Sequence, residues 1–159
     1  MIFLGYLGFS GNPPTLNRHI ESRGKINFTY PEDKQCLVQA LWHEARGEGQ
    51  EGIRNVAKVI QNRVNTKGFP STYCSVIHQK GQFTYRDHSR TDLKVPRSSQ
   101  EYEALTLVSL IAEEALTGRL RASVNSDVLW YHTVQVKPSW GKKFKLVEVH
   151  GNHKFYRAE

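Results

Sequence analysis

The sequence of 159 residues contains no long apolar run and no internal repeat. A helix that crosses a bilayer needs about 20 consecutive apolar residues, so we expect no integral membrane segment. The lack of a repeat excludes solenoids and propellers. With 38% hydrophobic and 23% charged residues, the composition is that of an ordinary globular protein, and the length suits one domain.

Cysteine is scarce, because Cys36 and Cys74 are the only two in the chain. Neither belongs to a C-x-x-C pair, which argues against a zinc site built from thiolates. The residues alone leave two states open, a pair of free thiols or a single disulfide.

Other catalytic motifs are also missing. His43-Glu44 could begin a zinc-protease helix, but that motif needs a second histidine where Gly47 stands. His132, His150 and His153 are expected to be surface or structural histidines rather than metal ligands. No nucleophile elbow and no phosphate-binding glycine loop occurs. We therefore expect neither a metal nor a cofactor.

Basic residues exceed acidic ones, 22 to 15, which gives a net charge of +7 and an isoelectric point near 9.5. Such a surface favours polyanions. The charges are scattered except for Lys142-Lys143-Phe144-Lys145, and scattered charge by itself selects no partner.

The pattern along the chain predicts an α+β fold in which helices dominate the first two thirds. Residues 1–30 are expected to form a loop-like arm, and their apolar start lacks the basic flank of a signal peptide. The expected domain, residues 31–159, has helices over about 32–47, 50–65 and 98–118, the last opened by a capping box of Ser98 and Glu101. A short helix or strand is expected at 75–79, an exposed loop at 80–97, and extended runs at 128–136 and 144–149.

Glu44 is the unusual residue of the first helix. Leu37, Ala40 and Leu41 form a helical stripe that should face the core, and Glu44 is the next residue of that stripe. A buried carboxylate is either paired with a cation or shifted to a higher pKa. A carboxylic acid that keeps its proton can protonate a glycosidic oxygen. The alternative is a structural Glu44 that pairs with Arg46 or Arg63 or turns to solvent at the end of the helix.

Glu48 follows Glu44 by four residues and has two interpretations. It could be a second carboxylate of the site, or it could cap the next helix, where negative charge is favoured. We prefer the cap, because Gly47 should interrupt the helix.

Aromatic residues cluster in the later part of the chain, interleaved with polar side chains. Such a set suits a groove that stacks sugar rings and hydrogen-bonds their substituents, and it equally suits a hydrophobic core, which we expect for about half of the aromatics. The candidates for sugar binding are Gln82, Phe83, Tyr85, Asp87, Tyr131, His132, Trp140 and His153, with Glu48 beside them.

At this point the residues resemble a known family. Trp42-His43-Glu44-Ala45-Arg46-Gly47-Glu48, Asn62-Arg63-Val64, Phe69-Pro70, Gln82-Phe83-Thr84-Tyr85 and Gly151-Asn152-His153 are similar to the motifs of SleB-type cell-wall hydrolases, which include spore-cortex lytic enzymes and phage endolysins. The resemblance covers about residues 34–157. The chain departs from the family at Arg86-Asp87-His88 and at Trp130-Tyr131-His132, so sugar contacts there are expected to differ.

The resemblance implies a lysozyme-like fold and cleavage of the bond from N-acetylmuramic acid to N-acetylglucosamine, with Glu44 as the catalytic acid. It also implies a disulfide between Cys36 and Cys74. The expected protein is a monomeric lytic transglycosylase that needs no cofactor, acts on peptidoglycan, contacts anionic envelope polymers but no nucleic acid, and is made in the host cytoplasm and released at lysis as an endolysin. The alternatives are a hydrolytic muramidase that uses Glu48 or Asp87 as a second carboxylate, and a non-catalytic basic module that binds envelope polyanions or nucleic acid.

Overall fold

A computed structural model describes residues 30–83, 93 and 96–159. Residues 1–29 of the predicted arm, and also Tyr85 and Asp87, lie outside the described residues. The described part contains four helices and three strands: α2 (Tyr30–Ala45), α3 (Gly49–Val64), α4 (Tyr73–Ile77), α6 (Ser99–Leu116), β1 (Val128–Thr133), β2 (Lys145–His150) and β3 (His153–Arg157). The predicted α+β fold with mainly helices is confirmed. No helix among these residues is long and apolar enough to span a membrane.

The helical core follows the predicted apolar stripes. Leu37, Ala40 and Leu41 of α2 are each 0% exposed. They meet the apolar side of α3, where Ile53 and Ile60 are equally buried. Burial of such side chains contributes roughly 1.5–3 kcal/mol each, which is the main force that holds α2 on α3.

The opposite side of α3 is polar, but it is not a solvent face. Asn62 Nδ2 donates to the carbonyls of Asn125 and Val128 at 2.8 and 2.9 Å, and Gln61 Nε2 donates to the carbonyl of Ala115 at 2.9 Å. These bonds hold the end of α6, the connection that follows it and the start of β1 against α3. The helix α3 is therefore enclosed on two sides. Its polar side chains donate hydrogen bonds to backbone carbonyls that would otherwise be buried without a partner.

The ends of α6 match the predicted signals with one difference. Ser98 Oγ accepts from the Glu101 amide at 3.2 Å, as in a capping box. Glu101 Oε2, however, accepts from the amide of Arg97 at 2.7 Å, one residue earlier than the box requires. Gly118, with φ of 72°, follows the last turn, where a residue without Cβ is favoured.

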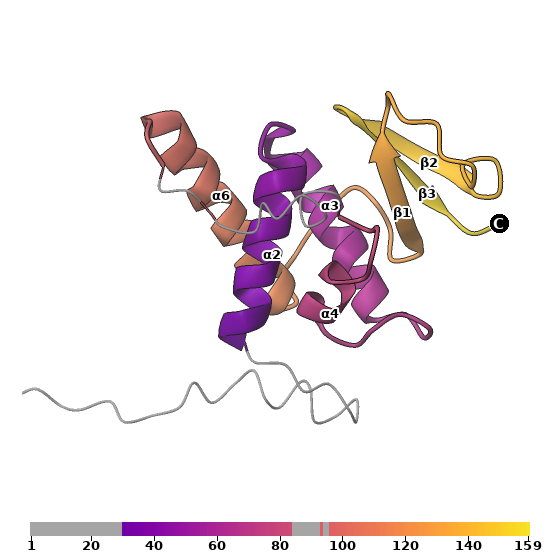
Figure 1. Ribbon diagram of the computed structural model, residues 1–159, viewed down its shortest axis with the longest axis horizontal. Helices are drawn as coiled ribbons and strands as arrows, with labels where there is room; N and C mark the ends of the chain where they lie inside the picture. Colours follow the sequence, from indigo (N-terminus) through magenta and orange to yellow (C-terminus); the bar gives the residue numbers. More distant parts are fainter. Residues whose placement is uncertain (1–29, 84–92, 94–95) are drawn as a thin grey trace, which may run out of the picture.

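The sheet has the order β1-β3-β2, with antiparallel pairing throughout. Two strands were predicted, and the central strand, β3, was missed. Gly151, with φ of 53°, and Asn152 form the two-residue turn between β2 and β3. Figure 1 shows the sheet at one end of the molecule and α6 at the other, with α2 and α3 between them.

The short segment after Phe69-Pro70 forms helix α4 rather than a strand, and a disulfide joins it to α2. Cys36 and Cys74 have a Cα–Cα distance of 5.3 Å and an S–S bond of 2.02 Å. Asp33 Oδ1 accepts from the Cys74 amide at 2.8 Å beside this bridge. Burial raises the pKa of the Asp33 carboxyl, although the amides of Cys74 and Tyr73 act in the opposite direction.

Candidate active site

Glu44 lies in the last turn of α2, at the end of the buried stripe. Its side chain is half-buried, and burial raises its pKa from 4.5 to about 7. Desolvation is the cause, because water stabilises the ionised carboxylate more than the surrounding side chains do. At neutral pH the group is thus divided between its acid and its carboxylate, which is the state that a general acid and base requires.

The two arginines that could have paired with Glu44 are engaged elsewhere. The guanidinium of Arg46 lies 4.7 Å from the centre of the Trp42 ring. Arg63 is 4% exposed and donates to the Leu129 carbonyl at 2.7 Å and to Gln82 Oε1 at 3.0 Å. Within the described part of the chain neither arginine forms an ion pair with Glu44. This geometry contradicts the interpretation of Glu44 as a paired structural carboxylate.

Glu48 joins the helices to the sheet. Its Oε2 accepts from the Asn152 amide at 2.6 Å and lies 3.8 Å from His153 Nδ1. A Cβ at Gly52 would meet the Glu48 side chain at 2.5 Å, and a Cβ at Gly151 would overlap its carboxylate. Two glycines therefore make room for this one side chain.

The predicted position of Glu48 at the N-terminus of α3, where negative charge is favoured, is confirmed. Glu48 occupies the N-cap position of α3, but its side chain accepts no bond from that helix. The Glu48 carboxylate accepts a hydrogen bond from the Asn152 amide instead, because the β2–β3 turn lies directly over the start of α3. The same bond reduces the freedom of Glu48 to act as a second catalytic carboxylate.

Three of the candidate sugar-binding residues lie on the side of the sheet that faces the helices, or in the core. Phe83 and His153 are 1% and 2% exposed, so both side chains lie in the core. This corrects the expectation that they contact the substrate. Tyr131 packs edge-on to the His153 ring, with centroids 5.3 Å apart, and it is only partly buried. Burial lowers the pKa of His153, and the nearby Glu48 carboxylate opposes this effect.

His132 and Trp140 lie on the opposite side of the sheet from Tyr131. Their rings are 5.6 Å apart, and His132 Nε2 is 2.8 Å from the hydroxyl of Tyr156. Gln82 is exposed but is held by Arg63. The predicted set is thus divided between two surfaces, which a single glycan strand lying in one groove does not reach together.

Sequence reasoning treated Arg63 only as an alternative partner for Glu44. The structure gives it another role, since its buried guanidinium connects α3, β1 and Gln82 and stacks 5.6 Å from the Phe69 ring. Burial lowers its pKa, and the nearby Tyr131 opposes this. The signal was present in the Asn62-Arg63-Val64 motif, which places a charged residue beside the apolar face of a helix.

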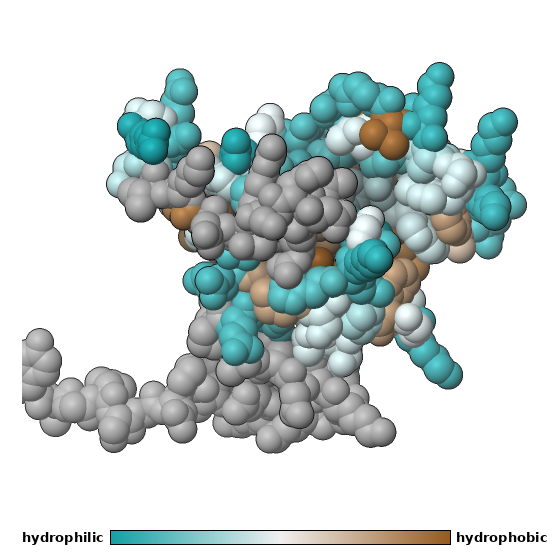
Figure 2. Space-filling model, viewed as in Figure 1, coloured by the Kyte–Doolittle hydropathy of each residue, from teal (hydrophilic) through white to brown (hydrophobic). Residues whose placement is uncertain are grey.

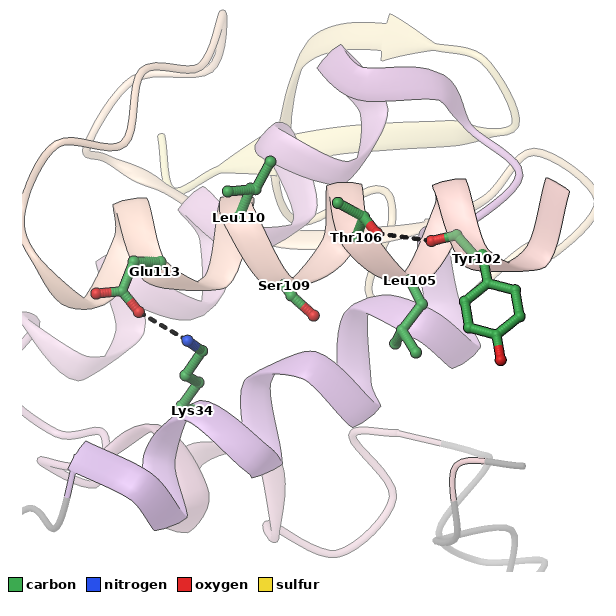
Figure 3. Close-up of a pocket in the computed structure, with 7 residues that line it drawn as sticks. All are labelled: Lys34, Tyr102, Leu105, Thr106, Ser109, Leu110 and Glu113. Carbon is green, nitrogen blue, oxygen red and sulfur yellow. Dashed lines mark hydrogen bonds and ion pairs between the residues drawn. The ribbon is translucent and has the colours of Figure 1, made fainter. Parts of the chain in front are cut away.

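One group of possible metal ligands occurs in the described part of the chain, formed by Cys36, Cys74 and His78. Both sulfurs are committed to the disulfide, and a disulfide sulfur is not the thiolate that binds zinc. A pocket of about 450 Å³ lies between α2 and α6, with the Lys34–Glu113 ion pair of 2.9 Å at one end (Figure 3). None of the predicted site residues lines it.

Comparison with known proteins identifies the family. The family model described as cell wall hydrolase matches residues 47–156, well over half of the chain. The chain belongs to the cell wall hydrolase family. Glu44 stands just before the matched range, so its role rests on the geometry given above and on the motif around it. The prediction of a cell-wall enzyme is confirmed at the level of the family.

Similar curated members of this family are spore cortex-lytic enzymes. The chain is 46% identical to that of Oceanobacillus iheyensis over 52 residues, which are 33% of this chain and 19% of the relative. It is 35% identical to that of Bacillus cereus over 79 residues, 48% of this chain and 30% of the relative. The match spans less than a third of the length of either relative.

Two solved structures have the same fold. The catalytic domain of the Bacillus cereus SleB protein has a TM-score of 0.67 at 24% identity and covers 83% of this chain and 94% of that domain. The catalytic domain of the germination-specific lytic transglycosylase SleB from Bacillus anthracis gives 0.66 at 24% identity, with 84% and 100% covered. The predicted family fold is confirmed.

Proposed function

We propose that this protein cleaves the glycan strands of peptidoglycan as a lytic transglycosylase, with Glu44 as its general acid and base. The observation that carries the proposal is the Glu44 carboxyl at the end of α2, whose pKa is raised to about 7 by burial, while both nearby arginines bind other groups. Membership in the cell wall hydrolase family supplies the class of substrate.

In this mechanism protonated Glu44 donates its proton to the glycosidic oxygen between N-acetylmuramic acid and N-acetylglucosamine. The bond to the muramic C1 breaks, and positive charge develops at that carbon. The Glu44 carboxylate then takes the proton from the muramic 6-hydroxyl, whose oxygen bonds to C1. The product is a 1,6-anhydro ring, and Glu44 ends protonated as it began.

Among the described carboxylates, the contacts of Glu48 and Asp33 favour this outcome over hydrolysis. A hydrolase with two carboxylates needs a second one free to bind water or to attack the sugar. Glu48 is occupied by the Asn152 amide and the neighbouring His153. Asp33, at the other end of α2, holds the amide of Cys74.

We place the glycan strand along Glu44, with Gln82 and Tyr131 as the candidate sugar contacts on the same side of the sheet. Both are tied to Arg63, one by a hydrogen bond and the other by its charge interaction. Arg63 is therefore a positioning residue in this proposal. His132 and Trp140 are omitted, because they lie on the other side.

Mass spectrometry of digested, purified peptidoglycan tests the proposal. We expect fragments that end in 1,6-anhydromuramic acid. Fragments with reducing muramic ends alone would make the protein a hydrolytic muramidase, and the absence of any cleavage would favour a binding module. The endolysin role stays part of the proposal: production in a bacterial cytoplasm should clear the culture only after the membrane is permeabilised.

A further inference from the structure

The two sides of the sheet differ in what covers them. In the strand pairing, Trp130 of β1 lies opposite Tyr156 of β3, which lies opposite Leu146 of β2. The next row on this side is His132, Lys154 and Val149. Successive residues of a strand point to opposite sides of a sheet, and residues that lie opposite each other on paired strands point to the same side. These six residues therefore share one side.

The other side of the sheet faces α3. Glu148 Oε1 accepts from Asn55 of that helix at 3.2 Å, and Phe155 is 0% exposed. The side chains in the rows of Trp130 and His132 therefore face away from the helices. We call this side the outer face.

The connection between β1 and β2 folds onto part of the outer face. Phe144 stacks on Trp130 with ring centroids 3.9 Å apart, and Trp140 meets the Tyr156 ring at 5.7 Å. This aromatic layer covers the β1 half of the outer face. The β2 half has no such cover among the described residues, and there Leu146 and Val149 are 47% and 54% exposed.

The exposed apolar side chains are concentrated in this region. Six large apolar residues of the described chain are strongly exposed, and four of them belong to the segment 136–149: Val136, Leu146, Val147 and Val149. Single exposed apolar residues are ordinary, whereas a group of them marks an interaction surface.

The same region is positively charged. From Val128 to Val147 the chain carries Lys137, Lys142, Lys143 and Lys145 and no acidic residue. All four lysines are exposed, and Lys154 stands on the outer face itself. Figure 2 shows hydrophilic side chains projecting around apolar surface at the end of the molecule that holds the sheet.

We propose that the outer face binds the surface of an anionic lipid bilayer. Leu146 and Val149 would enter the headgroup region, and the lysines would pair with lipid phosphates, the combination typical of proteins that lie on a membrane. An anionic wall polymer satisfies the lysines only, because it offers nothing to the exposed aliphatic side chains. The lipid therefore accounts for both features.

This surface is separate from Glu44 and does not depend on the proposed reaction. It would hold the enzyme on the membrane through the side of the sheet that faces away from α3. The sequence predicted anionic envelope polymers as partners, and this proposal replaces them with anionic lipid.

Sedimentation with vesicles tests the inference on the full chain. We expect binding to vesicles that contain phosphatidylglycerol and little binding to pure phosphatidylcholine. Replacing Lys142, Lys143 and Lys145 with Gln should weaken binding about 100-fold, at about fivefold for each lysine. The pair Leu146→Ser and Val149→Ser should weaken it on the order of tenfold or more.

Matched controls change the same chemistry elsewhere. Leu110→Ser removes a leucine that is 58% exposed on α6, and Lys67→Gln with Lys80→Gln removes two exposed charges outside the sheet. These variants should bind as wild type does, and thermal melts should show that every variant folds.

Tryptophan emission gives a second readout. Trp42 is 8% exposed within α2, so a Trp42→Phe variant leaves only Trp130 and Trp140 near the outer face. Their emission should shift to shorter wavelength on anionic vesicles. Equal binding to both vesicle types, no binding, or a loss caused by the lysine variants but not by the Leu146 and Val149 pair would each overturn the proposal; the last result would indicate a polyanion site without lipid contact.

Discussion

The ionised Glu44 side chain should lower the free energy of unfolding, and the effect should depend on pH. Its pKa rises from 4.5 to about 7 on folding, so the folded chain holds this proton more tightly than the unfolded chain does. The stabilising contribution is complete below about pH 4.5 and is lost as the pH rises toward 7. At about 1.36 kcal/mol for each pH unit between the two values, the loss approaches roughly 3 kcal/mol at neutral pH.

Glu44→Gln removes this loss, since glutamine is nearly isosteric and does not ionise. For a chain of this size, 3 kcal/mol corresponds to a rise in Tm on the order of 6 to 12 °C at neutral pH. The difference in Tm between mutant and wild type should close toward about pH 4, where Glu44 is mostly protonated in both the folded and the unfolded chain. Thermal unfolding followed by circular dichroism at several pH values measures it.

Glu103→Gln is the matched control, because Glu103 is exposed on α6. It should change Tm little at any pH. If Glu44→Gln melts at or below wild type at neutral pH, Glu44 is held by a cation, and the argument for a raised pKa is refuted.

Three further predictions follow from the same geometry. Replacing Cys36 and Cys74 with Ala should lower the free energy of unfolding by about 4 kcal/mol in a chain-entropy model, given their separation of 38 residues; alkylation of both thiols in the native, unreduced protein would show that no bridge exists. Gly151→Ala should cost roughly 1–3 kcal/mol in chemical denaturation because its φ is 53°, whereas Gly47→Ala, with open space around it, should cost much less; equal losses would contradict the packing of the β2–β3 turn. The kcat/KM for peptidoglycan should fall with pH above about 7, as Glu44 loses its proton, and an activity that still rises there would contradict its role as acid.

The helices and the position of Glu44 could be predicted because both depend on local patterns. The stripe of Leu37, Ala40 and Leu41 has helical spacing, and the next residue on it had to be either paired or desolvated. A single sequence cannot choose between these states, because Arg46 and Arg63 are both possible cationic partners for Glu44. The choice depends on tertiary partners, the Trp42 ring and the Leu129 carbonyl.

The strand β3 and the two sides of the sheet were harder to predict. The strand has only five residues, and its alternation of His153, Phe155 and Arg157 with Lys154 and Tyr156 is polar on both sides. The Gly151-Asn152 pair was the available signal, since such a pair favours a two-residue hairpin.

The division of the aromatic residues between two sides depends on strand register, which is set by that unrecognised hairpin. Tyr131 and His132 are neighbours on one strand and therefore face opposite sides of the sheet. The pairing with β3 shows which of the two faces the helices. For this reason the expected sugar-binding set combined residues of two separate surfaces.

The role of Glu44 as general acid is tested most directly by the rate at which a suspension of purified peptidoglycan clears. Glu44→Gln should fold, as its melting curve will show, and should clear the suspension more slowly by a factor on the order of 10² to 10⁴. Glu103→Gln should clear it at the wild-type rate. A Glu44→Gln protein that clears the suspension within a few-fold of wild type would contradict the assignment.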